Sequence, residues 1–348
     1  MANNSGDRND RFRSKHRRRF PPAIDPFDTD HITYVRRLEV YNQHLQREIQ
    51  RSLESLWDGQ PEHFAVATSG SDGRFEKAPQ SKMEVILLHD ASFDSREISI
   101  RLKELIRACP DILWDIDESK PLGDSSKPIS GYHGDSTKLY PTRMFDAELL
   151  SGNPAVFLGG LEQQERELLA PIGEKCFDNM VQRRKDSLGI MRTGSKNFRG
   201  KPIVHFDLGQ GFSYYTNPHL TDGGAGSFKF GPLRAVQYRL ASDLISAYRT
   251  AARAGKPLPF TLDDIPKNIP ERLLWLETGG FTSLPVPEAV FLADHYCYFL
   301  QQYHKSQWNY LKNGEMITEF DIEEVNNRMA DLSRLLQRPI IEMTNGSH

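Results

Sequence analysis

The chain has 348 residues, 38% of them hydrophobic, with a formal net charge of -3 and an isoelectric point near 6.4. This composition supports a packed core and excludes a wholly disordered protein, and at roughly 100–200 residues per domain the length predicts two domains. The small net charge argues against strong nonspecific affinity of the whole molecule for nucleic acid.

Cysteine spacing and apolar runs narrow the class of protein further. Cys109, Cys176 and Cys297 are far apart and form no CxxC pair, which argues against a zinc site or a disulfide framework and indicates a reducing compartment. No apolar run approaches the ~18 residues that a membrane span needs. We therefore expect a cytoplasmic protein without a membrane partner.

The first 30 residues are polar and basic and end in a proline-rich stretch. Two interpretations stay open. One is a solvated, disordered tail, since blocks of like charge repel each other. The other is an arm for an anionic partner, including a nuclear address at Lys15–Arg19. No apolar segment follows the basic residues, as it would in a secretory signal peptide. The basic residues within the first nineteen positions are Arg8, Arg11, Arg13, Lys15, Arg17, Arg18 and Arg19.

Hydrophobic periodicity predicts the elements of the first half of the chain. Residues 31–57 form an amphipathic helix with an apolar face of Tyr34, Leu38, Tyr41, Leu45, Ile49, Leu53 and Leu56. Next come a strand at 63–69, a Gly-rich loop, a strand at Met83–Leu88, a helix at Ser95–Ala108, a strand at Ile112–Ile116 and a long loop at 118–134.

From residue 143 onward the pattern turns helical. Helices are predicted at 143–151, 154–169, 172–190, 232–254, 268–278, 286–312 and 320–337, interrupted by a Gly-rich segment at 193–231 with one strand at Ile203–Leu208. The whole order predicts an α+β fold, with a small mixed-sheet domain at 58–145 and a mainly helical domain at 146–348.

The Gly-rich loop has the chemistry of an anion site. Gly70 and Gly73 allow a tight turn and a close approach of the backbone to a ligand, and successive N–H groups in such a turn attract anions. Ser71 adds a hydroxyl donor, and Arg74 adds a fork that suits phosphate. The alternative is an ordinary tight turn without a ligand.

The strand after the loop carries charged residues two positions apart. Lys82 and Glu84 share one face of this strand because side chains alternate with period two. We expect both side chains to point toward the loop. Two carboxylates at that spacing would hold magnesium ions that bridge nucleotide phosphates.

The pattern Gly-Ser-x-x-Arg-x-Glu at 70–76, followed by Ser81-Lys82-Met83-Glu84, resembles the active-site signature of the polymerase-β-like nucleotidyltransferases. Within that superfamily it is most similar to the nucleotidyltransferase part of the bacterial uridylyltransferase of nitrogen regulation and its short stand-alone relatives. The resemblance covers roughly residues 60–310. Its weaker downstream matches are Leu113-Trp114-Asp115, RMFDAELLSG at 143–152, Gly231-Pro232-Leu233-Arg234 and the segment 275–308.

This resemblance implies transfer of a nucleoside monophosphate from a nucleoside triphosphate to a hydroxyl group, with Mg²⁺ and with a protein as the acceptor. It assigns metal binding and catalysis to Glu84 together with Asp117 or Asp115, although Asp115 can equally be a surface residue at a strand edge. It assigns nucleotide binding to Gly70, Ser71, Gly73, Arg74 and Lys82, and to Lys229 and Arg234 of the segment at 223–234. A flexible loop is the simpler interpretation of that segment.

The sequence departs from the family at two positions. Lys82 stands where the family has its first strand carboxylate, and Ala235 stands where it has an aspartate. A protonated lysine cannot ligate magnesium. The rival prediction is therefore a catalytically inactive regulator that binds nucleotide or protein with the same fold. A third alternative is a nucleic-acid-binding module that acts through the arginine-rich tail.

Aromatic residues and histidines in the C-terminal part have no catalytic spacing. The aromatic residues at 296–310 follow helical spacing, which favours a core or a helix interface over a nucleic-acid platform. His205, Asp207, His295 and His304 have no metal-ligand spacing and are interpreted as structural or surface residues.

Overall fold

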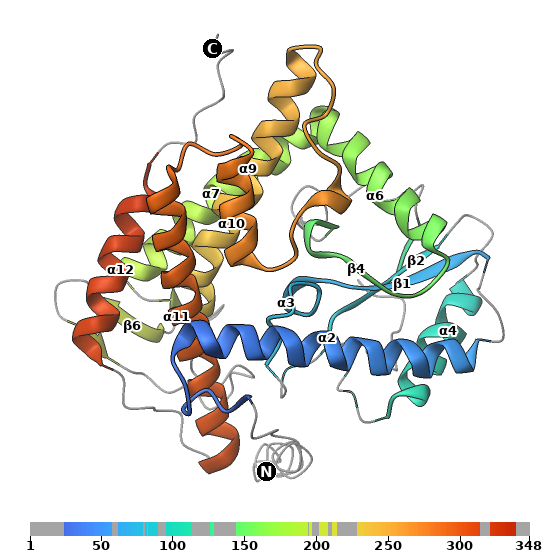
Figure 1. Ribbon diagram of the computed structural model, residues 1–348, viewed down its shortest axis with the longest axis horizontal. Helices are drawn as coiled ribbons and strands as arrows, with labels where there is room; N and C mark the ends of the chain where they lie inside the picture. Colours follow the sequence, from blue (N-terminus) through green and yellow to red (C-terminus); the bar gives the residue numbers. More distant parts are fainter. Residues whose placement is uncertain are drawn as a thin grey trace, which may run out of the picture.

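The computed structural model of the chain describes residues 24–57, 62–78, 81, 83–89, 95–110, 112, 114, 126–128, 144–193, 195–196, 202–207, 211–213, 228–313 and 321–338. Within this part the protein is mostly helical and carries a small, largely antiparallel sheet (Figure 1), so the predicted α+β class is confirmed at that level. The predicted residues Lys82, Asp115, Asp117 and the glycines at 223–226 lie outside the described residues.

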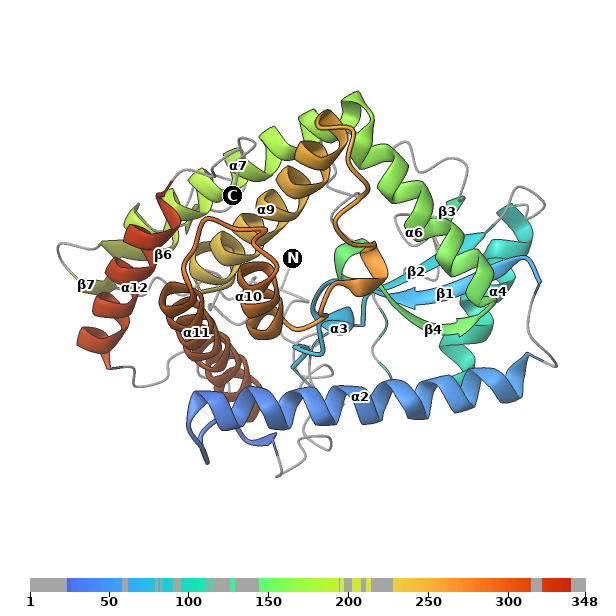
Figure 2. The ribbon, with the colours of Figure 1, turned by 45° about the horizontal axis from the view of Figure 1, so that its top comes forward.

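The predicted N-terminal amphipathic helix is confirmed as α2, His31–Leu56. At 1.5 Å per residue it is roughly 39 Å long, and Figures 1 and 2 show it running along one side of the molecule from the helical part to the sheet. Its buried face consists of Tyr34, Val35, Leu38, Asn42, Gln46, Ile49 and Leu53. Of the other residues in the predicted face, Leu45 is partly buried against the sheet core and Tyr41 is partly exposed, while the prediction is wrong at Leu56, which is exposed.

The main sheet has the strand order β3-β2-β1-β4. Its strands are β1 Phe64–Thr68, β2 Val85–His89, β3 Ser126–Pro128 and β4 Glu148–Gly152. The central strand β1 is antiparallel to both β2 and β4, and the short β3 joins β2 in parallel. At the carboxyl end of β1, Thr68 pairs with Val85 on one side and with Glu148 on the other. The three strand ends therefore meet at one point.

Both faces of β1 and β2 are buried, which explains why these two strands are mostly apolar along their whole length. Phe64 and Val66 face a core shared with α4, Ser95–Ala108, and with the second half of α2. Ala65 and Ala67 face the larger core, shared with α6, Pro154–Leu169. The bounds predicted for α4 and α6 agree with the structure.

The predicted helix at 143–151 is wrong. Residues Met144–Asp146 form one 3₁₀ turn, η3, and β4 follows directly. The sheet supplies the reason, because β1 offers its free edge to this segment. Gly152, at φ +100°, allows the close approach, since a Cβ there would lie 2.7 Å from the carbonyl oxygen of Phe64. The sheet thus extends beyond the predicted domain boundary at residue 145.

Most of the helical part lies at the end of the molecule away from the main sheet. Helices α6 and α7, Pro171–Thr193, run over the side of the molecule opposite α2 (Figure 2). After α6 the elements of the helical part are α7, a π-helical turn η4 Lys229–Leu233, α9 Arg234–Arg253, η5 Leu262–Asp264, α10 Ile269–Thr278, α11 Val286–Asn313 and α12 Ile322–Leu336. These helices lie close to their predicted positions. A small second sheet consists of β5 Ser195–Lys196, β6 Pro202–Asp207 and β7 Gly211–Ser213, of which β6 was predicted.

The last residues of the predicted tail pack against the helical part. Ile24 is buried, and the side chain of Gln301 on α11 donates to the backbone carbonyls of Pro26 and Thr29 at 2.9 and 2.8 Å. The prediction of a tail up to residue 30 is therefore wrong for 24–30, because Gln301 satisfies the backbone there. Residues 1–23 lie outside the described part.

The aromatic residues between 296 and 308 on α11 are core residues, as predicted. Tyr296, Phe299 and Trp308 are almost fully buried, and His304 contacts the hydroxyl of Tyr34 at 2.7 Å, which gives this histidine a structural role. No helix in the described ranges has the length and apolar character that crossing a membrane requires.

Candidate functional site

The candidate site lies where β1 ends. The chain makes one helical turn, α3, over Gly70–Gly73, where a loop was predicted. Glu84 stands at the entrance to the neighbouring strand β2, and its carboxylate lies against Gly70. A Cβ placed on Gly70 would lie 2.5 Å from Glu84 Oε2, and Gly70 also has φ +63°, which favours glycine. As predicted, Glu84 faces the Gly-rich turn.

A second carboxylate, that of Asp72, lies within this turn and is almost fully buried. Its Oδ2 accepts the backbone N–H of Glu84 at 2.9 Å, which ties the turn to β2. Its Oδ1 lies 3.7 Å from Nζ of the buried Lys77 and has no hydrogen-bond partner among the described residues. Burial raises the pKa of the Asp72 carboxyl to about 7, although the positive charge of Lys77 opposes this shift.

The middle of α2 holds the turn from one side. Asn42 Nδ2 donates to the backbone carbonyls of Phe75 and Lys77, at 3.1 and 2.9 Å, and Gln46 Nε2 donates to the carbonyl of Asp72 at 2.8 Å. Phe75 has φ +58°, a left-handed conformation that costs energy for a residue with a side chain. The α2 amides therefore stabilise an irregular backbone that has no other secondary structure to pair with.

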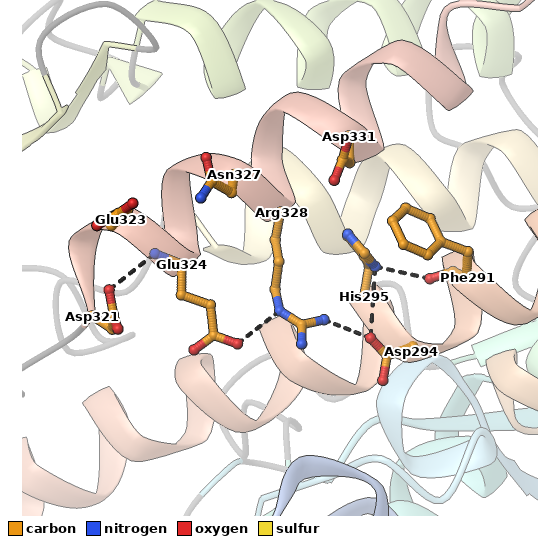
Figure 3. Close-up of a pocket in the computed structure, with 9 residues that line it drawn as sticks. All are labelled: Phe291, Asp294, His295, Asp321, Glu323, Glu324, Asn327, Arg328 and Asp331. Atoms are coloured by element: carbon orange, nitrogen blue, oxygen red, sulfur yellow. Dashed lines mark hydrogen bonds and ion pairs between the residues drawn. The ribbon is translucent and has the colours of Figure 1, made fainter.

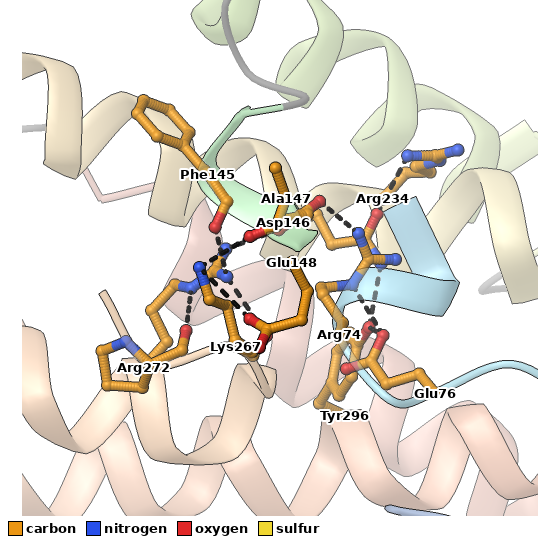
Figure 4. Close-up of polar contacts among 12 residues, drawn as sticks. Arg74, Glu76, Phe145, Asp146, Ala147, Glu148, Arg234, Lys267, Arg272 and Tyr296 are labelled. Atoms are coloured by element: carbon orange, nitrogen blue, oxygen red, sulfur yellow. Dashed lines mark hydrogen bonds and ion pairs between the residues drawn. The ribbon is translucent and has the colours of Figure 1, made fainter. Parts of the chain in front are cut away.

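Arg74 holds the turn from the other side through a buried ionic network (Figure 4). Its Nε donates to Glu76 at 2.7 Å, and its Nη1 donates to Asp146 of η3 at 2.5 Å. Asp146 also accepts from Arg272 of α10 at 2.9 Å. Burial would raise the pKa of the Asp146 carboxyl, but the two guanidinium groups outweigh it and hold this pKa below its usual value.

The same network reaches the long helices of the helical part. The Tyr296 hydroxyl on α11 donates to Glu76 Oε2 at 2.8 Å and accepts from Gln237 Nε2 on α9 at 2.8 Å. Gln237 in turn accepts from Arg234 at 3.1 Å. We call the set Arg74, Glu76, Asp146, Arg272 and Tyr296 the turn network. It fixes the position of the turn relative to three helices.

The nucleotide-binding residues predicted from the sequence are found in three kinds of place. Gly70 and Ser71 lie in the turn itself, and Gly73 lies there in close contact with η3, since a Cβ at this position would come within 1.6 Å of the Asp146 carbonyl oxygen. Arg74 belongs to the turn network, and Arg234 adjoins it through its hydrogen bond to Gln237. Lys229 lies on η4, with Nζ 5.9 Å from the ring centroid of Tyr303.

Most of the residues that position the turn were not among the predicted site residues. Asn42 and Gln46 lie four residues apart in the buried stripe of α2, so polar residues at core positions were a signal that could have found them. Asp146 lies within the quoted segment RMFDAELLSG, without a predicted role. Arg272 and Tyr296 gave no local signal, because their partners lie far away in the sequence.

The carboxylates near the turn define what the site can hold. Glu84 and Asp72 lie on the Gly70 side of the turn, whereas Glu76 and Asp146 are paired with Arg74. The described residues contain no group of three or more His, Cys, Asp or Glu side chains that could hold a metal ion. Magnesium in nucleotide sites often takes only one or two protein carboxylates and completes its shell with phosphates and water. Glu84 therefore fits a magnesium ion that arrives with a nucleotide, whereas Asp72 is already engaged with Glu84 N–H and Lys77.

Comparison with known proteins gave no match, either to a protein-family model or to a curated protein sequence.

Proposed function

We propose that this protein binds a nucleoside triphosphate at the Gly70–Gly73 turn and, as a polymerase-β-like nucleotidyltransferase, transfers its nucleoside monophosphate to a hydroxyl group of a protein acceptor. One observation carries the proposal. The Glu84 carboxylate lies against the bare Cα of Gly70, between two adjacent antiparallel strands. This juxtaposition is the one expected if Glu84 holds the magnesium ion of a bound nucleotide.

The turn offers suitable groups for phosphate. The first N–H groups of a helical turn have no acceptor within it, and the absence of a side chain at Gly70 lets the Glu84 carboxylate approach the backbone of this turn closely. Ser71 is partly exposed in the same turn and supplies a hydroxyl donor. The backbone and Ser71 would therefore bind phosphate oxygens, and Glu84 would bind the magnesium ion that accompanies them.

A second candidate function is that of an inactive regulator that binds nucleotide without transferring it. Two observations favour it. The guanidinium of Arg74 is held by Glu76 and Asp146 inside the protein, which leaves it little freedom to bind phosphate. Lys82 replaces a carboxylate that metal-dependent transfer uses. A unit positive charge ~4 Å from a magnesium site would oppose metal binding by about 1–4 kcal/mol at high to intermediate dielectric.

Calorimetric titration of the full chain with ATP and with UTP, each with and without Mg²⁺, tests the proposal. We expect binding of at least one nucleotide, weakened by Glu84→Gln only when Mg²⁺ is present. Glu62→Gln is the matched control, because the Glu62 side chain is 87% exposed beside the other end of β1. Absence of binding for both nucleotides would overturn both candidate functions.

Measurements of nucleotide transfer and of nucleotide binding distinguish the two candidate functions. An active transferase should move label from the α-phosphate of the bound nucleotide onto protein, and Glu84→Gln should abolish that transfer. A regulator should bind the nucleotide equally well with and without Mg²⁺ and transfer nothing. For a regulator we expect Lys82→Asp to create Mg²⁺-dependent binding, because it restores a carboxylate beside Glu84.

A further inference from the structure

A second polar site lies between α11 and α12 (Figure 3). It is a cavity of about 440 Å³. Its wall contains five carboxylates and one arginine, which leaves a net charge of -4 when its histidine is neutral (five negative charges and one positive). The residues that line it are Phe291, Asp294, His295, Asp321, Glu323, Glu324, Asn327, Arg328 and Asp331. We call this the α11–α12 pocket.

Part of this negative charge is compensated within the protein. Arg328 donates to Asp294 at 2.5 Å and to Glu324 at 3.0 Å, and its guanidinium lies 4.4 Å from the ring centroid of Tyr298. His31 of α2 contacts the other oxygen of Asp294 at 2.7 Å. These contacts tie α11 to α12. The other carboxylates of the wall are partly engaged as well, since Asp331 accepts from Arg334 at 2.8 Å and Asp321 Oδ1 accepts the backbone N–H of Glu324 at 3.0 Å, while Glu323 is exposed.

His295 points to a ligand independently of the carboxylates. Its side chain is only 3% exposed, and its Nδ1 lies 2.9 Å from the carbonyl oxygen of Phe291. A carbonyl oxygen only accepts, so Nδ1 carries the proton, and in the neutral ring Nε2 is an acceptor. Among the described residues this buried Nε2 has no hydrogen-bond partner. Figure 3 shows it pointing toward α12, on the side where Arg328 and Asp331 lie.

The neutral state of His295 agrees with its surroundings. Burial lowers its pKa, as does the Arg328 guanidinium, while Asp294 and Asp331 act in the opposite direction. An unsatisfied buried acceptor lowers stability, and a donor that enters the pocket would remove that cost. The donor must also be compatible with the surrounding carboxylates. Both requirements are met by a cation that carries N–H groups.

We propose that the α11–α12 pocket binds an organic cation, an ammonium or guanidinium group, that donates to His295 Nε2 and pairs with the carboxylates of α12. A bare metal ion fits less well, because the described residues contain no group of three or more metal-ligating side chains. An anion is excluded by the net charge of the wall.

Two sources can supply this cation. One is a free polyamine or a similar small molecule. The other is the arginine-rich segment 8–19 of the same chain. The described chain begins at Ile24, and seven residues later His31 contacts Asp294 of the pocket.

Calorimetry with spermidine as the probe tests the proposal on two full-length chains. One is the natural chain. The other, called the uncharged chain, lacks the positive charges of segment 8–19, because it carries Gln in place of Arg8, Arg11, Arg13, Lys15, Arg17, Arg18 and Arg19. If the segment occupies the pocket, the uncharged chain should bind spermidine about tenfold or more tightly than the natural one, and a peptide of residues 1–23 should compete. Equal affinity for the two chains would identify a free cation as the natural ligand.

Two substitutions made in the uncharged chain test whether spermidine binds in the α11–α12 pocket. We expect Asp331→Asn to weaken spermidine binding about fivefold, as loss of one charge ~4 Å away predicts. His295→Phe should weaken it by removing the acceptor. Glu162→Gln on α6, where the carboxylate is 67% exposed, is the control for nonspecific charge. No spermidine binding in either chain, or equal weakening by Asp331→Asn and Glu162→Gln, would overturn the proposal.

Discussion

On one side of the Gly70–Gly73 turn, each buried charge contacts a charge of opposite sign. Arg74 donates to Glu76 and Asp146, and Asp146 also accepts from Arg272, at distances between 2.5 and 2.9 Å. On the other side, Asp72 and Lys77 approach only to 3.7 Å, and Asp72 Oδ1 has no hydrogen-bond partner among the described residues. The same short segment therefore contains a hydrogen-bonded ionic network and a more loosely held ion pair.

This difference shows which part of the turn has a structural role and which part can change its protonation state or respond to a ligand. A compensated buried network is costly to disturb, because removing one member leaves the others charged and unpaired. A carboxylate with a raised pKa is easily protonated, and it can also respond to a ligand that brings charge. The proposed nucleotide site lies on the Asp72 side, next to Glu84.

The largest effect is expected when the turn network is broken. Asp146→Ala leaves the guanidinium groups of Arg74 and Arg272 buried without their shared carboxylate, which costs about 3–5 kcal/mol of unfolding free energy. Urea unfolding followed by circular dichroism measures this. Arg166→Gln is the control, because the Arg166–Glu162 pair is exposed on α6 and should change stability by less than about 1 kcal/mol. Equal losses in the two variants would show that the network is not compensated as described.

The pH dependence of the unfolding free energy should report the titration of Asp72 on the other side of the turn. The Asp72 pKa, raised by burial to about 7 from 3.8, means that the folded protein keeps a proton that the unfolded chain releases between these values. Stability should therefore fall as pH rises through this window, with up to about 1.4 kcal/mol lost per pH unit, and level off above it. Asp72→Asn, which cannot titrate, should remove this loss.

The measurement is the difference in unfolding free energy between the natural chain and Asp72→Asn from pH 4 to 8. Other carboxyl groups titrate in both proteins and cancel in the difference. We expect the asparagine variant to gain stability relative to the natural chain as pH rises. A difference that does not depend on pH would show that Asp72 is ionised throughout, and would remove the contrast between the two sides.

A smaller effect on stability tests whether the Glu84 carboxylate lies against Gly70. Gly70→Ala and Gly255→Ala introduce the same left-handed strain, since φ is +63° and +61°, but only at Gly70 would the new Cβ meet another group, at 2.5 Å from Glu84 Oε2. We expect a common loss of about 1–2 kcal/mol from the backbone, and a further loss at Gly70 alone. Adding Glu84→Ala should abolish that further loss. If Gly70→Ala costs no more than Gly255→Ala, the carboxylate does not lie against the turn.

Local signals in the sequence were sufficient for the regular elements. Pro154 begins α6 next to Asn153, whose side chain accepts the backbone N–H of Ala155, and the helix has the bounds that were predicted from periodicity and caps. The sequence failed at η3 and β4, where a segment with helical spacing became an edge strand. Only the presence of β1 beside it decides that outcome, because strand pairing is a non-local interaction.

The sequence by itself determined the helices, the strand–turn–strand unit and the expectation that Glu84 faces the turn, because periods of 3.6 and 2 residues fix which side chains share a face. The tertiary structure alone decided the partners of the buried charges. Arg74 and Asp146 are 72 residues apart, and Arg272 and Asp146 are 126 apart. Charge pairing depends on distance in space and on burial, and neither quantity can be read from the order of residues along the chain.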